Sequence, residues 1–163
     1  MSTKKIIIES KDTKTRAGII IRLAGTDKFL TEIAWGKYAP NNYRDIVKGH
    51  LSQGESLKVG ACREAFEETG IQINPEDLAE LGIYSYGGGD LHIFYVEKSF
   101  DISRCHCSST FINKWDKEVP EVRNFELISL YDNIDSLYFH KGLRPILKKE
   151  IKKILGENKH DII

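Results

Sequence analysis

The sequence predicts an α+β fold in which helices flank a mixed β-sheet, and three observations support this class. Several segments are rich in β-branched residues, which favour buried strands, and turn signals separate them. Two other segments repeat apolar residues at helical spacing. The strands and helices mix without a regular βαβ alternation, so a sandwich of helices and a mixed sheet is the expected class.

The composition is that of an ordinary globular protein. The 163 residues suit one domain, 1–163, and contain no internal repeat or linker. Apolar residues make up 40% of the chain and charged residues 29%. Because 24 basic residues balance 24 acidic ones, no global field favours tight nonspecific binding of nucleic acid.

No segment has the length of a membrane span, and the N-terminal isoleucine run is too short for a signal peptide. The three cysteines are an odd set without the spacing of a disulfide framework, and they are Cys62, Cys105 and Cys107. The Cys-His-Cys run at 105–107 cannot supply a closed zinc site by itself. We therefore expect a cytoplasmic protein with reduced thiols and no membrane association.

The first elements are two neighbouring strands. Residues 16–23 (RAGIIIRL) indicate a buried strand, residues 24–27 a turn, and residues 28–35 the next strand. Residues 36–43 have the composition of a loop. Residues 45–56 begin with a short apolar piece and continue as a loop bounded by glycines.

A helix follows, with Ser56 as its N-cap and Gly70 as its end. Residues 78–86 and 91–99 then indicate a pair of strands joined by a glycine-rich hairpin turn at 87–90. The pattern after this hairpin is irregular until a further strand begins.

The last third of the chain contains one strand and one helix. Residues 100–121 have no clear period, and residues 122–130 indicate a strand. Residues 143–155 form an amphipathic helix, in which Pro145 is tolerated because it falls in the first turn. Its apolar positions are Leu143, Ile146, Leu147, Ile151, Ile154 and Leu155.

The central helix concentrates negative charge. Glu64, Glu67 and Glu68 stand at i, i+3 and i+4, so they share one face. An apolar stripe occupies the other side, and it consists of Val59, Cys62 and Phe66. We expect the apolar stripe to pack against the protein and the carboxylate face to be open.

Two interpretations fit three carboxylates at this spacing. Like charges repel by roughly 0.2–0.5 kcal/mol per pair on an exposed helix, which a solvated acidic face tolerates. A divalent cation would remove the repulsion, and oxygen ligands of this kind suit Mg²⁺ or Mn²⁺.

The spacing of the surrounding residues favours the cation. Five residues separate Gly49 from Glu55, seven separate Glu55 from Arg63, and the run REAFEETGI completes the stretch. This stretch resembles the Nudix box, G-x5-E-x7-R-E-U-x-E-E-x-G-U, where U is apolar. All nine specified positions match over 23 residues, with the small Ala65 at one U position. The flanking strands and the terminal helix also resemble the Nudix α/β/α sandwich.

The resemblance implies roles for the residues of the box. It implies that Glu67 and Glu68 bind the metal and that Glu64 binds it or orients and deprotonates the attacking water. The carbonyl of Gly49 is a further candidate ligand.

Glu55 and Arg63 also belong to the box. The resemblance places Arg63 among the catalytic residues, and we expect it to brace the loop and helix through a charged hydrogen bond to Glu55.

Many Nudix enzymes add a carboxylate just before a strand of the form E-x-x-E-V-x-W-x-x-L. The similar segment here is EVPEVRNFELISL, residues 118–130, with Asn124 in place of the tryptophan. The resemblance makes Glu118 the additional ligand or base, followed by Glu121. Surface charge is the alternative for both, so the general base is open among Glu64, Glu118 and Glu121.

The box does not recognise the group X of a nucleoside diphosphate linked to X. The run KGH resembles the start of the box in diadenosine polyphosphate hydrolases and in enzymes that remove pyrophosphate from RNA 5′ ends. Lys48 and His50 are therefore candidate polyphosphate contacts, although a solvated lysine and a bystander histidine are alternatives. Tyr84 and Tyr86 could stack on a nucleobase or belong to the core.

The resemblance implies a nucleotide substrate and hydrolysis of a pyrophosphate bond with Mg²⁺ or Mn²⁺. We favour dinucleoside polyphosphates or 5′-polyphosphorylated nucleotides, RNA 5′ ends included. The alternatives are (d)NTPs or nucleotide sugars of the ADP-ribose type, and a non-catalytic binding module of the same fold. Retention of Glu64, Glu67 and Glu68 favours the enzyme. A homodimer is an open alternative to a monomer.

Overall fold

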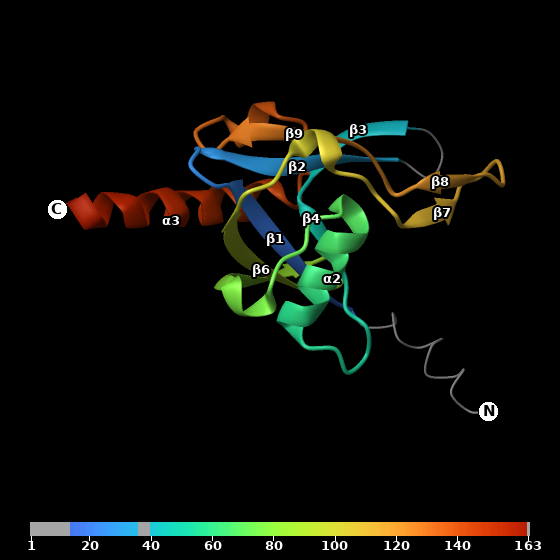
Figure 1. Ribbon diagram of the computed structural model, residues 1–163, viewed down its shortest axis with the longest axis horizontal. Helices are drawn as coiled ribbons and strands as arrows, with labels where there is room; N and C mark the ends of the chain where they lie inside the picture. The colour runs from blue at the N-terminus through green and yellow to red at the C-terminus, as the bar shows by residue number, and fades with distance from the viewer. Residues whose placement is uncertain (1–13, 36–39, 163) are drawn as a thin grey trace.

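A mixed sheet forms the centre of the molecule (Figure 1). The computed structural model describes residues 14–35 and 40–162, and within them seven strands make up this sheet. The spatial order is β3-β2-β1-β6-β5, with β4 also paired to β1 and β9 to β2. The strands are β1 (Thr15–Leu23), β2 (Lys28–Trp35), β3 (Pro40–Asp45), β4 (Val47–His50), β5 (Ala79–Tyr86), β6 (Gly89–Lys98) and β9 (Val122–Ser129). Only the β1–β6 pair in this part of the chain is parallel, so the sheet is mixed as predicted.

Two α-helices, α2 and α3, are described, together with shorter elements. The helices are α2 (Leu57–Thr69) and α3 (Arg144–Ile162). Three 3₁₀ turns connect other elements, and they are η1 (Pro75–Asp77), η2 (Ile102–Arg104) and η3 (Ile134–Ser136). The strands β7 (Thr110–Ile112) and β8 (Glu118–Pro120) form a small antiparallel hairpin away from the main sheet (Figure 1).

The two α-helices cover opposite faces of the sheet. Ile19 and Ile21 of β1 pack in the same cluster as Ala61 and Ala65 of α2. Ile20, which points to the other face because side chains alternate along a strand, packs with the apolar positions of α3. The result is the predicted α/β/α layering. None of the described helices is long and apolar enough to cross a membrane.

The sheet divides near its middle, and this division creates the place for the central helix. Strands β1 and β2 pair near their connecting turn, at Arg22 and Phe29. Strand β4 pairs with the first half of β1, from Arg16 opposite His50 to Ile19 opposite Val47. The end of β4 therefore lies beside the first half of β1. From there the chain continues through residues 51–56 into α2.

Most predicted elements are confirmed, and the differences lie where pairing partners are distant in sequence. Residues 40–43 were expected in a loop but belong to β3, which pairs with β2. The Arg44 N–H of this strand also donates a hydrogen bond to the carbonyl of Tyr138 at 3.0 Å. Residues 36–39 of the same predicted loop lie outside the described residues. The irregular segment 100–121 contains the β7–β8 hairpin, and the terminal helix extends beyond its predicted end.

Candidate active site

Helix α2 begins and ends where the sequence predicts. The Ser56 hydroxyl accepts a hydrogen bond from the Val59 N–H at 3.2 Å, which satisfies one free donor of the first turn. Gly70 has a left-handed φ of 80°, and its N–H donates to the carbonyl of Phe66 at 2.9 Å. A glycine suits this place because a side chain there would strain the backbone.

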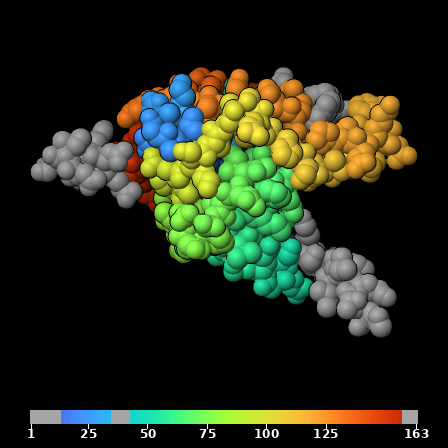
Figure 2. Space-filling model, in the orientation of Figure 1, coloured from blue at the N-terminus to red at the C-terminus, as the bar shows by residue number. Residues whose placement is uncertain are grey.

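The orientation of α2 is the reverse of the prediction. Glu64 and Glu68 are buried, with 6% and 7% of their surfaces exposed, whereas Val59 and Phe66 are each 48% exposed. The prediction that the apolar stripe packs and the carboxylate face is open is therefore wrong, except that Cys62 is buried. In Figure 2 the green residues of α2 reach the surface beside the yellow segment around residue 100.

Small residues explain this orientation. The side of α2 that faces the sheet carries Gly60, Ala61 and Ala65, all buried, and small side chains allow the helix to approach closely. A Cβ on Gly60 would lie 2.2 Å from Cδ2 of Leu51. The small side chains of this face therefore allow the backbone of α2 to lie close to the sheet, while Val59 and Phe66 remain exposed.

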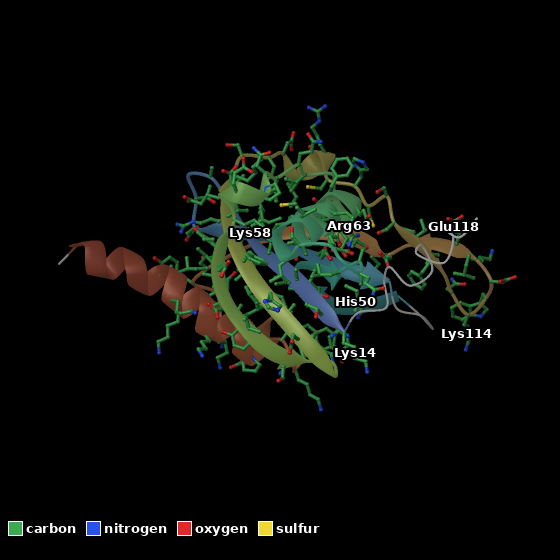
Figure 3. The ribbon with its side chains drawn as sticks, turned by 90° about the horizontal axis from the view of Figure 1, so that it is seen from below. Lys14, His50, Lys58, Arg63, Lys114 and Glu118 are labelled. Carbon is green, nitrogen blue, oxygen red and sulfur yellow. The ribbon has the colours of Figure 1, made fainter. Side chains whose placement is uncertain are left out.

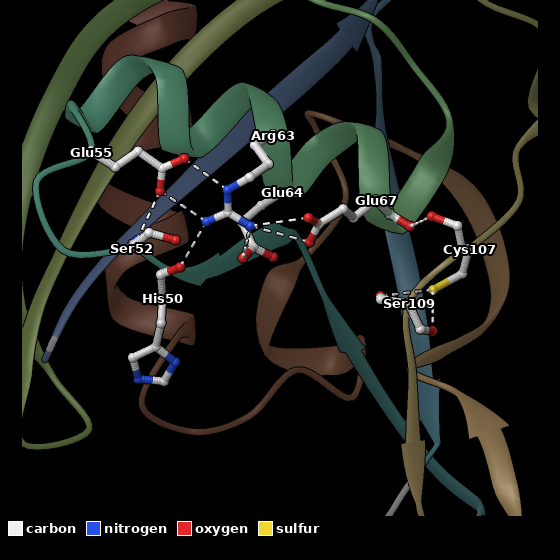
Figure 4. A network of polar contacts seen from close by, with 9 residues as sticks. His50, Ser52, Glu55, Arg63, Glu64, Glu67, Cys107 and Ser109 are labelled. Atoms are coloured by element: carbon white, nitrogen blue, oxygen red, sulfur yellow. Dashed lines mark hydrogen bonds and ion pairs between the residues drawn. The ribbon is translucent and has the colours of Figure 1, made fainter. Parts of the chain in front are cut away.

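Arg63 connects the acidic residues of this region (Figure 4). Its Nε and Nη2 donate to the two carboxylate oxygens of Glu55 at 2.8 and 3.0 Å, and Nη2 also donates to the His50 carbonyl at 3.2 Å. Its Nη1 donates to Glu64 at 3.1 Å and to both oxygens of Glu67 at 3.2 Å. These hydrogen bonds, first of all those to Glu55, raise the pKa of Arg63.

The expected bracing contact between Glu55 and Arg63 is thus present. Glu55 Oε1 also accepts a hydrogen bond from the Ser52 N–H at 2.8 Å. The fork-shaped guanidinium therefore ties the loop before α2 to the middle of the helix.

Gly49 approaches the carboxylate of Glu64 very closely. A Cβ on Gly49 would lie 2.2 Å from both Cδ and Oε1 of Glu64. Any side chain at this position would displace the Glu64 carboxylate, so the sequence requires glycine here for space.

Glu68 lies deeper, against a second carboxyl group that the sequence analysis did not include. This group belongs to Glu32 of β2, and a hydrogen bond joins the two side chains. Burial raises the pKa of Glu68 to about 8, and burial together with the charge of Glu68 raises the pKa of Glu32 well above its ordinary range. Asp45 and Lys48 lie near both, and Lys48 Nζ is 3.0 Å from Asp45 Oδ2.

These residues fit a hard divalent cation in donor type. Carboxylates and a backbone carbonyl are the ligands that Mg²⁺ prefers. Glu68 Oε1 is buried and has no hydrogen-bond partner among the described residues, and Gly49 leaves room for Glu64. In the part of the chain that the structure describes, no three His, Cys, Asp or Glu side chains converge as they stand on a point that could hold a metal. Instead, Arg63 binds Glu64 and Glu67.

A model of the NUDIX domain family matches residues 12–149 of this sequence. The chain belongs to the Nudix family. It is accordingly a Nudix hydrolase, and hydrolysis of pyrophosphate bonds is its class of reaction. Nudix enzymes typically use a divalent metal, and their substrates are nucleotides.

Solved structures agree with a Nudix fold. An Ap4A hydrolase from C. elegans is 21% identical, with a TM-score of 0.60, and the match covers 86% of this chain and 98% of that one. A NUDIX hydrolase from Nitrosomonas europaea is 20% identical, with a TM-score of 0.59 and coverage of 83% and 86%. A MutT protein from Methanosarcina mazei is 18% identical, with a TM-score of 0.59 and coverage of 85% and 93%. No protein of curated function matches the sequence significantly.

The proposed downstream carboxylates lie on the β7–β8 hairpin and directly after it. Glu118 is exposed on the β7–β8 hairpin, where it accepts a hydrogen bond from the Thr110 hydroxyl at 2.6 Å (Figure 3). Glu121 is also exposed, and its N–H donates to the carbonyl of Ser109 at 3.0 Å. No described contact joins either carboxylate to the glutamates of α2, and their role as ligand or base stays a prediction.

The four candidate substrate residues lie in three different places. Lys48 Nζ lies 5.3 Å from the ring centroid of Tyr86, so these two residues are neighbours. The ring of His50 is exposed and, in Figure 4, points away from Arg63. Tyr84 instead donates a hydrogen bond to the buried carboxylate of Glu150 on α3, which indicates a structural role.

Arg16, Glu32 and Asp45 were not identified from the sequence as candidate site residues. Arg16 of β1 donates to the Tyr86 carbonyl at 2.9 Å, and its guanidinium lies 5.6 Å from the centroid of that ring. Glu32 lies on the same face of β2 as the buried Leu30, and a charged residue at an inward position of a strand was the available signal.

The Cys-His-Cys segment has a structural position. The three cysteines of the described chain are free thiols, as predicted. The N–H groups of His106 and Ser108 donate to the carbonyls of Thr69 (3.0 Å) and Glu67 (2.8 Å). The segment therefore satisfies carbonyl groups at the end of the Nudix helix.

Proposed function

We propose that this Nudix hydrolase uses Mg²⁺, with Mn²⁺ as a substitute, to hydrolyse a nucleoside diphosphate linked to a further phosphorylated group. The observation that carries the proposal is the state of Glu68. Its carboxylate is buried on the Nudix helix, beside Glu64, with one oxygen that has no hydrogen-bond partner among the described residues. A buried carboxylate of this kind is costly unless a proton or a cation compensates for it.

Glu64, Glu67 and Glu68 would hold the cation, with the Gly49 carbonyl as a further ligand and Glu118 as the candidate from the hairpin. A bound cation would neutralise charge on the pyrophosphate oxygens and help to orient the attacking water. Glu64 is the candidate for orienting or deprotonating that water, since Gly49 leaves its carboxylate in a defined position. Arg63 holds the preceding loop against the helix through its two hydrogen bonds to Glu55.

The substrate preference rests on two cations that lie around Tyr86. The side chains of Lys48 and Arg16 both lie within cation–π distance of the Tyr86 ring. Strand pairing also places Arg16 opposite His50. A chain of three or more phosphates is longer than the cation site alone, and these side chains could bind its far end. We therefore favour dinucleoside polyphosphates and 5′-polyphosphorylated nucleotides, including RNA 5′ ends.

Other Nudix substrates are the second candidates. ADP-ribose, with two phosphates, would use the same carboxylates and need fewer of the cations around Tyr86. A (d)NTP carries the same triphosphate as a 5′-triphosphorylated RNA end, and the substrate panel below distinguishes the two. A non-catalytic binding module would have no need for Glu64, Glu67 and Glu68 together.

A substrate panel tests the proposal. The protein is incubated with Mg²⁺ and, separately, Ap4A, dNTPs, ADP-ribose and 5′-triphosphorylated RNA, and the products are separated by chromatography. We expect the highest kcat/KM for Ap4A or the triphosphorylated RNA, and no turnover in EDTA. If the wild type and Glu67→Gln both released product only at the background rate for every substrate, the proposed hydrolase activity would be refuted.

A further inference from the structure

Glu32 and Glu68 form a buried pair of carboxyl groups across two layers of the fold. Glu32 belongs to β2 and is 4% exposed, and Glu68 belongs to α2 and is 7% exposed. A hydrogen bond joins the two groups. One oxygen of each, Oε2 of Glu32 and Oε1 of Glu68, has no hydrogen-bond partner among the described residues.

The surrounding charges do not neutralise this pair. The neighbouring carboxylate of Asp45 adds negative charge, and Lys48 is the cation that acts on all three. Lys48 Nζ is 3.0 Å from Asp45 Oδ2, so its ammonium group is held by Asp45 first. Arg63 is engaged by Glu55, Glu64 and Glu67.

The buried carboxyl group of Glu32 would lower the stability of the fold if it had no function. Burial of an unsatisfied carboxyl oxygen is unfavourable, and an apolar residue in line with Leu30 would avoid that cost. The contact that Glu32 does make is with Glu68, which the proposed function places in the cation site. The geometry therefore points to a role that is exercised through Glu68.

We propose that Glu32 is a positioning residue for the cation site, which donates a hydrogen bond to Glu68 and so fixes the direction of that carboxylate. This inference rests on the proposed function and adds to it a residue of β2, outside the Nudix box. A hydrogen bond to one oxygen of Glu68 restricts rotation of the carboxylate, and the second oxygen keeps a fixed place for a ligand. Hydrogen-bond partners of metal ligands typically contribute about 10- to 100-fold to metal affinity.

Mn²⁺ binding to the full chain tests this role without substrate. Free Mn²⁺ is measured by electron paramagnetic resonance during titration of the wild type, Glu32→Gln and Glu32→Leu. Glu32→Leu removes the donor, and we expect Mn²⁺ to bind about 10- to 100-fold more weakly. Glu32→Gln keeps a donor in the same place, and we expect its affinity to return to within about threefold of the wild type.

Two further variants give the experiment its controls. Glu126→Gln removes one carboxylate from β9, the strand next to β2, where Glu126 pairs with Arg44 at the surface. We expect it to bind Mn²⁺ like the wild type. In a Glu68→Gln background, Glu32→Leu should cause no further loss, because a residue that acts through Glu68 is not additive with it.

The outcomes separate this inference from the proposed function. If the wild type binds no Mn²⁺, or Glu68→Gln binds it normally, the proposed cation site fails and this inference fails with it. If the wild type binds Mn²⁺ through Glu68 and a folded Glu32→Leu binds equally well, only the positioning role is overturned. If Glu32→Gln and Glu32→Leu weakened Mn²⁺ binding equally, the positioning role would also be overturned. The affinity for Mn²⁺ would then depend on the charge of Glu32 and not on its hydrogen bond to Glu68. Near-ultraviolet circular dichroism and the thermal midpoint check that each variant is folded.

Discussion

Gly49 and Glu64 lie so close that a Cβ on the glycine would stand 2.2 Å from Oε1 of the glutamate. Gly49 of β4 pairs with Ala17 of β1, one position before the last pair of these strands, while Glu64 comes from the middle of α2. The absence of a side chain at Gly49 therefore leaves the space that the Glu64 carboxylate occupies, at the position where the cation is proposed to bind.

Gly49→Ala tests this relationship. The added methyl group should displace the Glu64 carboxylate, and a displacement of about 1 Å can lower turnover by about 10²-fold. Gly156→Ala on α3 is the matched control, since a Cβ there meets no atom within 4 Å. We expect the control to keep full activity and to gain up to about 1 kcal/mol of stability, because alanine favours a helix. Normal turnover in Gly49→Ala would mean that the position of Glu64 is not critical.

Loss of either proposed ligand should abolish most activity. Glu67→Gln and Glu68→Gln each remove one negative charge from the proposed cation site, and we expect kcat to fall by orders of magnitude with the fold intact. Glu76→Gln, an exposed carboxylate on η1, is the control and should be unaffected. Near-normal rates in both site variants would refute the ligand assignment.

Arg63→Lys should lower stability as well as activity. Lysine cannot replace the paired hydrogen bonds to Glu55, nor reach Glu55, Glu67 and the His50 carbonyl at once. Because Arg63 is partly exposed, we expect a loss of about 1–2 kcal/mol in the free energy of unfolding, measured by urea denaturation. Arg104→Lys, at an exposed position on η2, should change it by less than about 0.5 kcal/mol. Equal stability of the two variants would contradict the bracing role.

The stability of the metal-free protein should fall as the pH rises from 5 to 8. Burial raises the pKa of Glu68 from 4.5 to about 8, so between these values the folded protein holds a proton that the unfolded chain has released. The unfavourable contribution of Glu68 is absent below pH 4.5 and complete above pH 8. Glu32, whose pKa burial also raises, lowers the stability in the same direction as the pH rises. Thermal midpoints in EDTA should therefore decrease across this range, and Glu68→Gln should flatten the decrease. Added Mg²⁺ should raise the wild-type midpoint most at pH 8, and an identical slope in Glu68→Gln would exclude Glu68 as the cause.

Tyr84 should contribute to stability and not to substrate binding. Tyr84→Phe removes the hydroxyl that donates to buried Glu150, and we expect a loss of about 1–3 kcal/mol in the free energy of unfolding with KM unchanged. Tyr131→Phe, at a side chain that is 71% exposed, is the control and should change neither quantity. A raised KM in Tyr84→Phe would instead place this tyrosine in the substrate site.

Local signals were sufficient for the boundaries of the regular elements. Ser56 and Gly70 cap α2 as their chemistry predicts, because capping involves only residues within one turn. The β-branched run at 16–23 forms the buried strand β1, as predicted. Its side chains favour a strand that is packed against apolar residues, and this preference is visible in the local sequence. The spacing of the Nudix box identified the family, and the family model confirms it.

Short strands could not be predicted in the same way. Strand β3 depends on β2 and on the carbonyl of Tyr138, which is far away in the sequence. Strands β7 and β8 have three residues each, too few for a periodic pattern to show. Their existence is decided by pairing partners, which a local pattern does not contain.

The sequence by itself determined which carboxylates gather on one face of α2, because the spacing i, i+3, i+4 admits no other arrangement in a helix. Only the tertiary structure decided that this face lies against the sheet. Close packing over β4 requires the small side chains of Gly60, Ala61 and Ala65, and Glu64 and Glu68 share their side of the helix. The same packing brings Glu32 of β2 against Glu68, a contact between distant segments that hydrophobic periodicity cannot reveal.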